Sequence, residues 1–329
     1  MEQETLFSST VGVLAVIMMI PVFFVWLEKK TRWKVFNFLP AIIWIFLTPI
    51  FLSNLNIIPR ESPIYDTFRS FAVPLFIVLM LLDINIRQSM KVAWRGAIVL
   101  TIGAVGIVIG CVAAYAAFSA GVPDNAWSGF GALAGSWIGG TGNLAAVAES
   151  LDTPSELVGI VVIVDNIVYL VYFPLILTCK RWAEPFNRFT GVRQEEIDHF
   201  IAVTNEVEKK THEVHFSDVL TLVGWGFVTI VAARWVAGMV PEFPPVLTTS
   251  TWTILLVTTF GVLLSATPLK DVPGTEPLSM SFVYLYMTMI GASADLRQLG
   301  EAHWFLVAGF VAIAIHPVSY THLTLPTIN

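Results

Sequence analysis

One glycine-rich run of the chain carries the residue types best suited to holding an ion or a small polar solute. Its sequence is Gly135-Ser136-Trp137-Ile138-Gly139-Gly140-Thr141-Gly142-Asn143-Leu144-Ala145-Ala146-Val147-Ala148-Glu149. Glycines from Gly139 to Gly142 permit an unwound backbone, whose carbonyls can meet a cation and whose amides can meet an anion. Asn143 then begins a short apolar helix, whose N-terminus carries partial positive charge. We therefore predict a binding role for six residues of the run: Ser136, Gly139, Gly140, Thr141, Gly142 and Asn143.

The same glycines allow a purely structural interpretation. Gly131, Gly135 and Gly139 recur at intervals of four residues, a spacing with which small residues let two helices pack closely. That interpretation suits the part of the run before Gly139. It does not account for the stretch from Gly139 to Asn143, for which a binding role is the competing interpretation.

A polar pair, Asp165-Asn166, lies about one third of the way into the apolar run Leu157–Thr178. A carboxylate at that depth is costly in lipid, so it should face protein or a cavity. Tyr169 and Tyr172 follow at helical spacing and share its face. We predict that Asp165, with Asn166, binds Na⁺ or H⁺ as a coupling ion. The alternative is a hydrogen-bonded carboxyl that only fixes helix packing.

Weaker signals give no metal or disulfide site. His212-Glu213-Val214-His215 lacks the spacing of zinc proteases, and Cys111 and Cys179 lie inside or at the edge of apolar runs. Glu149 is either at the mouth of the glycine-rich segment or a solvated helix end, and Arg234 either snorkels to the interface or meets an anion. No cofactor is predicted beyond Na⁺ or H⁺ as coupling ion.

The elements that must position these residues are membrane-spanning helices. Of 329 residues, 56% are hydrophobic and 13% charged, against roughly 25% charged in soluble domains. That composition excludes an ordinary cytosolic enzyme, and a net charge of −6 argues against nucleic-acid binding. Because lipid offers the backbone no partners, long apolar runs must be helical. The runs are Leu6–Leu27, Phe38–Leu55, Phe71–Ile86, Gly96–Phe118, Leu157–Thr178, Phe216–Val236, Thr248–Ala266, Ser279–Ala292 and Trp304–Ile315.

The glycine-rich segment Ser128–Ser150 is not counted among the spans. Lys and Arg gather after the first and third spans and in the connection that follows Thr178, which predicts a multi-pass plasma-membrane protein with its N-terminus outside. The segment from Ser128 to Thr178 must then cross an odd number of times, although it holds two apolar stretches. We therefore predict that Ser128–Ser150, which six glycines interrupt, is a re-entrant loop or broken hairpin.

An internal repeat is also predicted. Adding 210 to the numbers of the first half superposes its first three spans on those of the second half, and Trp94 falls on Trp304. The charge pattern predicts that the second copy is inverted, as in secondary transporters. Residues 1–179 would form the first repeat, 180–215 a charged cytoplasmic connection and 216–317 an incomplete second repeat. Residues 318–329 resemble translated sequencing-adaptor sequence and are expected to be non-native, with a genuine short tail as the alternative.

From Gly135 to Glu149 and at Asp165-Asn166, the chain resembles a bacterial membrane family known as domain of unknown function 819, also called YjcL-like. The resemblance covers nearly all of Leu6–His316 and includes Ala294-Asp295-Leu296-Arg297. It implies an all-α polytopic fold of two inverted repeats with a discontinuous segment. It also implies a distant relation to the cation:proton antiporter and anion transporter superfamily.

We expect a secondary active transporter that moves a small solute, coupled to Na⁺ or H⁺, by alternating access. In the alternative, a monovalent cation/proton antiporter, Asp165 exchanges a cation for a proton. An organic-anion symporter would instead use the Asn143 helix end with the hydroxyls of Ser136 and Thr141.

Two further classes are less favoured. An intramembrane enzyme using Asp165 with Glu149 has no supporting motif, so no catalytic residue is predicted. A non-transporting scaffold or sensor is a remote alternative. The expected partners are the lipid bilayer and a small-molecule or ion substrate, with a homodimer left open and nucleic acid excluded.

Overall fold

The computed structural model describes residues 5–82, 86–179, 213–244, 246–294 and 303–324. Over these ranges the chain is all α-helical, apart from two short 3₁₀ turns and one isolated bridge between Phe243 and Leu247. The predicted all-α class is therefore confirmed. Most of the predicted connection 180–215, and the Asp295-Leu296-Arg297 part of the family resemblance, lie outside the described residues.

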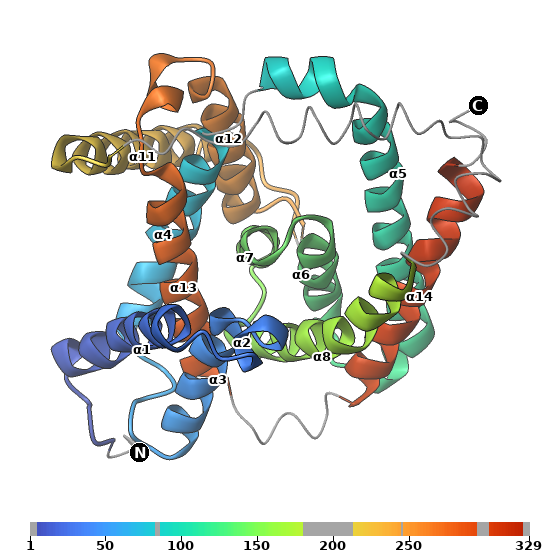
Figure 1. The fold of residues 1–329 in the computed structure, drawn as a ribbon, viewed down its shortest axis with the longest axis horizontal. Helices are drawn as coiled ribbons and strands as arrows, with labels where there is room; N and C mark the ends of the chain where they lie inside the picture. Colours follow the sequence, from blue (N-terminus) through green and yellow to red (C-terminus); the bar gives the residue numbers. More distant parts are fainter. Residues whose placement is uncertain (1–4, 83–85, 180–212, 245, 295–302, 325–329) are drawn as a thin grey trace.

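The helices form two groups, which lie on opposite sides in Figure 1. The first helix group consists of α1 (Thr10–Thr31), α2 (Val35–Phe38), α3 (Ala41–Asn54), α4 (Pro63–Leu82), α11 (Phe216–Ala237), α12 (Thr249–Leu264) and α13 (Thr275–Ser293). The second helix group consists of α5 (Ile86–Phe118), α6 (Ala126–Gly139), α7 (Thr141–Ser150), α8 (Ser155–Cys179) and α14 (His303–Thr324). The 3₁₀ turns are η1 (Ser119–Gly121) and η2 (Pro268–Asp271).

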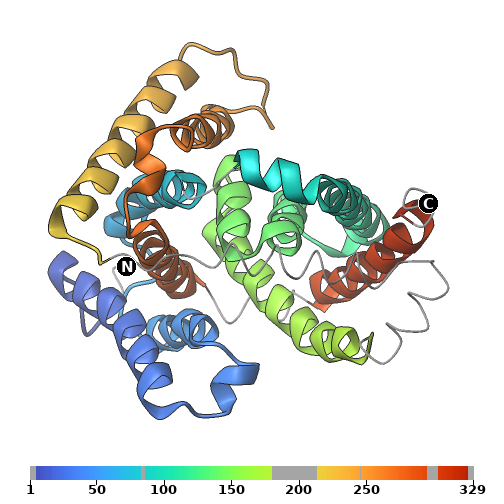
Figure 2. The ribbon, with the colours of Figure 1, turned by 45° about the horizontal axis from the view of Figure 1, so that its top comes forward.

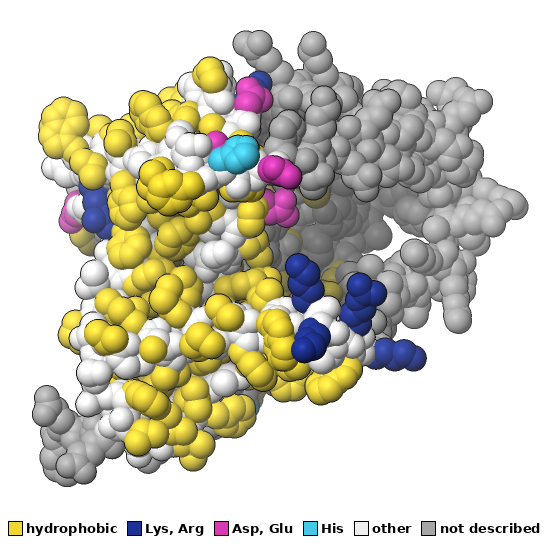
Figure 3. Space-filling view, turned by 60° about the vertical axis from the view of Figure 1, so that its left-hand side comes forward, with side chains coloured by type: hydrophobic (Ala, Val, Ile, Leu, Met, Phe, Trp, Pro, Cys, Tyr) yellow, Lys and Arg dark blue, Asp and Glu magenta, His cyan; other side chains and the backbone are white. Residues whose placement is uncertain are grey.

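Helix lengths and apolar composition fit a bilayer. Four described helices are long and apolar enough to cross it, namely Thr10–Thr31, Pro63–Leu82, Leu100–Gly121 and Phe216–Ala237. Three shorter apolar helices are Ala41–Asn54, Thr249–Leu264 and His303–Ile315. The predicted runs Leu157–Thr178 and Ser279–Ala292 lie in α8 and α13. Large apolar side chains such as Met19, Val231 and Trp235 are exposed, and Figure 3 shows hydrophobic side chains spread over this side of the molecule.

The helices differ most from the predicted apolar runs at three ends. Helix α4 begins at Pro63 rather than at Phe71, α5 begins at Ile86 rather than at Gly96, and α14 continues to Thr324 rather than ending at Ile315. An apolar run shows which residues favour lipid. A helix can extend beyond that run, because its backbone hydrogen bonds also form through polar residues. Polar residues such as Asp66 and Arg69 therefore lie inside the first turns of α4.

Helices α6 and α7 form a broken hairpin, as predicted for Ser128–Ser150. A side chain at Gly131 would collide with Leu151, one at Gly135 with Val147, and one at Gly139 with Asn143. The three glycines therefore form the stripe through which the two arms pack. The structural interpretation of the four-residue spacing is confirmed for this part of the run.

The packing within the first helix group is reciprocal. Helix α4 contacts α11 and α12 of the second half of the chain, and α13 contacts α1 and α3 of the first half. Helices α4 and α13 also pack on each other, as do α5 and α14. The views in Figures 1 and 2 both place α4 beside α13 at the centre of the group.

The two helix groups meet along the hairpin and α8. Helix α7 packs on α4 and α12, while α8 packs on α13. Within the second group, α6 contacts α5, α7 and α8. The hairpin is thus held between the two groups, with its tip near the centre of Figure 1.

Candidate functional site

The tip of the hairpin is a single residue, Gly140, between the end of α6 and the start of α7. Its backbone has φ 82° and ψ −167°, a conformation that glycine adopts far more readily than other residues. The amide of Gly140 donates to the carbonyl of Ser136 at 2.6 Å, and its carbonyl accepts from the amide of Leu144 at 3.0 Å. The predicted break within Gly139–Gly142 is therefore confirmed at this residue.

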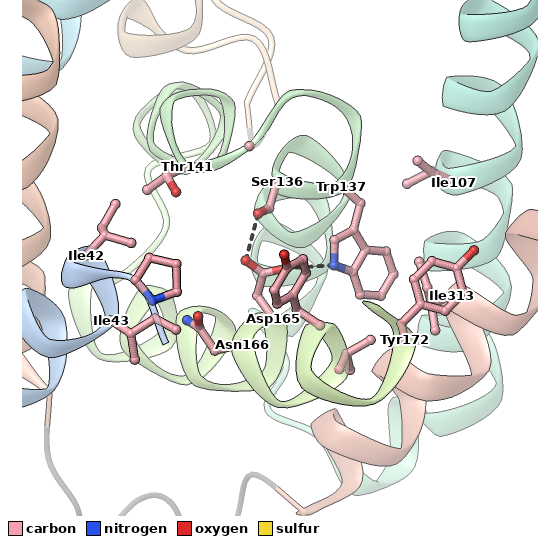
Figure 4. A pocket seen from close by; sticks show the side chains of 14 residues that line it. Ile42, Ile43, Ile107, Ser136, Trp137, Thr141, Asp165, Asn166, Tyr172 and Ile313 are labelled. Carbon is pink, nitrogen blue, oxygen red and sulfur yellow. Dashed lines mark hydrogen bonds between the residues drawn. The ribbon is translucent and has the colours of Figure 1, made fainter. Parts of the chain in front are cut away.

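Asp165 is bound by the last turn of α6. The hydroxyl of Ser136 donates to Oδ2 at 2.8 Å, and the indole Nε1 of Trp137 donates to Oδ1 at 2.7 Å. Figure 4 shows both side chains pointing from α6 toward Asp165 on α8. Two donors on the two oxygens stabilise a carboxylate more than a neutral carboxyl, which would supply a donor of its own.

A cavity of about 510 Å³ adjoins this carboxylate. Both helix groups line it, as Figure 4 shows for the isoleucines of α3, α5 and α14 around the polar centre. The lining residues are Pro40, Ile42, Ile43, Ile107, Ser136, Trp137, Gly140, Thr141, Asp165, Asn166, Val168, Tyr169, Tyr172 and Ile313. Mostly apolar walls with a few convergent polar groups are typical of a small-molecule or ion site.

The side chain of Asn166 is hydrogen-bonded within its own helix. Its Nδ2 donates to the carbonyl of Val162 at 2.7 Å. This bond uses the amide nitrogen, so the side-chain oxygen is the atom of Asn166 suited to a cation. Tyr169 and Tyr172 lie on the same wall of the cavity, as their helical spacing from Asp165 predicts.

The cavity brings together five of the eight predicted site residues: Ser136, Gly140, Thr141, Asp165 and Asn166. The other three, Gly139, Gly142 and Asn143, are not among its lining residues. The side chain of Asn143 occupies the space where a side chain on Gly139 would lie, and Gly142 faces Met80 of α4. The structure gives packing contacts for these three residues, and their predicted binding role stays a prediction.

Sequence reasoning missed two residues. Trp137 lies in the glycine-rich run, but the sequence analysis gave no role to its indole N–H, which is a hydrogen-bond donor. Arg69 was overlooked because it lies outside the predicted third span. Its Nε donates to Oε2 of Glu149 at 2.6 Å. Glu149 therefore does not line the cavity, and its side chain is partly exposed at the end of α7. Within the described ranges, His, Cys, Asp and Glu form no cluster of three able to hold a metal.

Comparison with known proteins assigns the chain to a family. The family model described as "Protein of unknown function (DUF819)" matches residues 15–324. The chain belongs to the DUF819 family. Among curated proteins, it is 28% identical over 281 residues to "Uncharacterized membrane protein YjcL" of Bacillus subtilis strain 168. That alignment covers 83% of this chain and 70% of the relative.

Membership of the DUF819 family confirms the resemblance seen in the sequence. Together with the apolar helices, it identifies a membrane protein whose helices contact a lipid bilayer. Since the family description names no activity, a function must be argued from the Asp165 cavity and the fold around it.

Proposed function

We propose that this DUF819 protein is a secondary active transporter that moves a small solute, coupled to Na⁺ or H⁺, by alternating access. The observation that carries the proposal is Asp165, whose two oxygens are bound by the end of a broken hairpin beside a cavity. In secondary transporters, substrate and coupling ion bind where discontinuous helices interrupt the bundle. A buried carboxylate at that position is the group able to exchange a cation for a proton.

Reciprocal packing supports the inverted repeat. With the offset of 210, Leu75 corresponds to Leu285, and Gly226 corresponds to Val16. Gly226 of α11 lies directly against Leu75 of α4, while Val16 of α1 and Leu285 of α13 pack on one cluster of buried residues. Corresponding helices therefore pair in both halves, α11 with α4 and α1 with α13.

A second pair of crossings follows the same pattern. Gly261 of α12 lies against Leu81 of α4, and Gly291 of α13 lies against Phe46 of α3. Leu81 and Gly291 are equivalent under the offset of 210, whereas Gly261 corresponds to Phe51 and not to Phe46, so the second pair matches at the level of helices. Reciprocal packing of this kind is expected of an inverted-repeat transporter.

The distribution of Lys and Arg supports a cavity that faces the cytoplasm. Pro40, on its wall, follows the cationic segment from Lys29 to Lys34. Tyr169 and Tyr172 lie in the half of α8 that leads to the connection 180–212, which holds six Lys and Arg residues. By the positive-inside rule, both segments are cytoplasmic. The structure is therefore interpreted as an inward-facing state with an outside N-terminus.

A monovalent cation/proton antiporter is the second candidate, and the lining of the cavity favours it over an anion symporter. Among the described lining residues, Asp165 is the one ionisable acid, and none is Lys, Arg or His. An anion would meet a carboxylate without a compensating cation, which costs free energy in a low-dielectric site. Glu149 is paired with Arg69, so this carboxylate is not available to Asp165 as an enzyme dyad would require.

The test is gradient-driven flux in proteoliposomes. Asp165→Asn removes the exchangeable charge and keeps the side-chain volume, so flux is expected to fall to the rate of empty liposomes. Glu156→Gln, an exposed acid in the first turn of the same helix, is the matched control and should keep parental flux. Unchanged flux in Asp165→Asn, with Glu156→Gln also active, would contradict the proposal.

Flux measurements in the same vesicles distinguish a solute symporter from a cation/proton antiporter. Na⁺ and pH gradients are imposed one at a time, against a panel of labelled carboxylates and of monovalent cations. An antiporter moves Na⁺ or another monovalent cation against H⁺ with no carboxylate present. A solute symporter accumulates a labelled compound only when the gradient of its coupling ion is present.

A further inference from the structure

A second polar cluster lies at the opposite end of α7 from the hairpin tip, around the turn from Glu149 to Ser155. Arg69 of α4 makes three bonds to it. Its Nε donates to Oε2 of Glu149 at 2.6 Å, one terminal nitrogen donates to Oγ of Ser155 at 3.0 Å, and the other donates to the carbonyl of Thr153 at 3.1 Å. The side chains of Arg69 and Glu149 are each 19% exposed.

Helix α12 binds the same turn. The hydroxyl of Thr251 donates to the carbonyl of Ser150 at 2.6 Å, and that of Thr248 donates to Oδ2 of Asp152 at 2.9 Å. Both helices that hold the turn, α4 and α12, belong to the first helix group, whereas the turn belongs to the second. The cluster is therefore a polar connection between the two groups.

The cluster lies far from the Asp165 cavity along α8. Ten residues separate Ser155 from Asp165, a rise of about 15 Å at roughly 1.5 Å per residue. Tyr169 and Tyr172, which line the cavity, lie farther along the same helix. None of the residues in the cluster lines the cavity. The cavity and the cluster thus lie toward opposite ends of α8.

Two buried polar atoms beside the cluster lack partners in this state. The hydroxyl of Thr153 and that of Tyr286 make no hydrogen bond within the described structure, although Thr153 is 1% exposed and Tyr286 is 0% exposed. Tyr286 interacts electrostatically with both Arg69 and Glu149. A buried hydroxyl without a partner costs free energy, so a state in which these hydroxyls gain partners would recover that cost.

We infer that the Arg69–Glu149 ion pair is the closed gate on the side opposite the cavity opening. It holds α7 on α4, and it must break when the Asp165 cavity becomes accessible from that side. Arg69 and Glu149 are thus positioning residues for the transport cycle. The inference rests on the proposed function, but its test measures accessibility and needs no knowledge of the substrate.

The experiment uses the full chain with Cys111 and Cys179 replaced by Ala and one reporter, Thr141→Cys, on the cavity wall. A membrane-impermeant maleimide is applied to right-side-out and, separately, to inside-out membrane vesicles. The parent is expected to react much faster from the cavity side than from the gate side. In Arg69→Gln and Glu149→Gln, labelling from the gate side should become about tenfold faster, the change expected when the population of the state open to that side rises by that factor.

Arg234→Gln is the matched control. Arg234 of α11 donates to the carbonyl of Ser70 at 2.5 Å, so it also binds α4, but within the first helix group. Its replacement should leave labelling from both sides at parental rates. The exchanged pair Arg69→Glu with Glu149→Arg should return labelling toward the parental pattern, which a general loss of stability would not do.

Cross-linking gives a second measurement if the single variants fold poorly. Cysteines replacing Ser150 and Thr251, whose parent residues are in contact, are joined by a short thiol cross-linker with a reducible bond. Cross-linked protein should abolish labelling of Thr141→Cys from the gate side, and reduction should restore it. The inference is overturned if labelling from the gate side is the same in parent, Arg69→Gln, Glu149→Gln and cross-linked protein. If neither the parent nor any variant shows gradient-driven flux, the proposed function is refuted. The labelling result is independent of that outcome.

Discussion

Ser136 and Trp137 are adjacent in sequence, yet both reach one carboxylate. Consecutive residues on a helix point about 100° apart, so the hydroxyl and the longer indole approach the two oxygens of Asp165 from different directions. This arrangement fixes the rotamer of Asp165 at the cavity wall. The two hydrogen bonds also tie the hairpin to the proposed coupling residue.

Loss of either donor should strengthen proton binding at Asp165, because both donors stabilise the ionised carboxylate. Ser136→Ala removes one hydrogen bond to a charged group, worth about 1.5 kcal/mol or roughly tenfold in affinity. With H⁺ as the coupling ion, we expect the H⁺ concentration that gives half-maximal flux to fall by about that factor. Trp137→Phe should act similarly because it keeps the ring and removes the N–H donor. The check is flux measured as a function of Na⁺ or H⁺ concentration.

Ser128→Ala is the control for that series. Ser128 lies on the same helix and donates to the carbonyl of Asn125 rather than to Asp165. Its replacement should leave the ion dependence unchanged. An equal change in Ser128→Ala and Ser136→Ala would show that the effect comes from α6 stability and not from the carboxylate.

At the scale of elements, the glycines of the hairpin have two different roles. Gly140 has a positive φ and open space around it, whereas Gly135 has an ordinary helical backbone and lies 2.9 Å from Val147 and 3.0 Å from the carbonyl of Asn143, measured from an added Cβ. Alanine at Gly140 is therefore strained, while alanine at Gly135 is crowded.

Both alanine variants should lower stability, each by about 1–3 kcal/mol. Gly224 of α11 has neither restriction, so Gly224→Ala should raise stability by up to about 1 kcal/mol through helix propensity. Thermal unfolding of the three variants in detergent measures these differences. A destabilised Gly224→Ala would show that glycine content, rather than the hairpin geometry, controls the result.

The sequence predicted the elements well where composition alone decides them. The expected run Phe216–Val236 agrees with α11 (Phe216–Ala237) to within one residue, because that segment is mostly apolar and its charged residues, Asp218 and Arg234, lie near its ends. The break in the hairpin was also predictable, since it depends on local glycines. The start of α4 was not, because Asp66 and Arg69 look like loop residues until a distant partner is known.

Partnerships between distant residues were beyond sequence reasoning. Arg69 and Glu149 are 80 residues apart, and nothing local to either one indicates the other. The same holds for Trp137 and Asp165, although each lies in a segment that the sequence analysis singled out. Spacing predicts what shares a helix face, whereas tertiary packing decides which faces meet.

On the scale of the whole molecule, two glycines hold the crossings between the halves. An added Cβ on Gly291 would collide with the backbone oxygen of Phe46, and one on Gly261 would lie 3.2 Å from side-chain atoms of Leu81. A backbone atom cannot move aside as a side chain can. Gly291→Ala should therefore destabilise the protein by about 2–3 kcal/mol and Gly261→Ala by about 1 kcal/mol or less.

Unfolding midpoints of the two variants, measured in the same detergent, check that order. If Gly261→Ala proves the more damaging substitution, the description of the two crossings is wrong. If both variants are as stable as the parent, then the close approach of α3 to α13 and of α4 to α12 contributes little to the fold.

The single-residue turn at Gly140 joins the carbonyl end of α6 to the amide end of α7. Partial charges of about −0.5 and +0.5 at such ends are then separated by one residue, and to a distant ion they largely cancel. The main chain at the tip therefore has polar groups but favours neither cations nor anions. Among the described residues of the cavity wall, discrimination between cations and anions would then depend on the carboxylate of Asp165. A single substitution at this position should therefore change which sign of ion the pocket accepts.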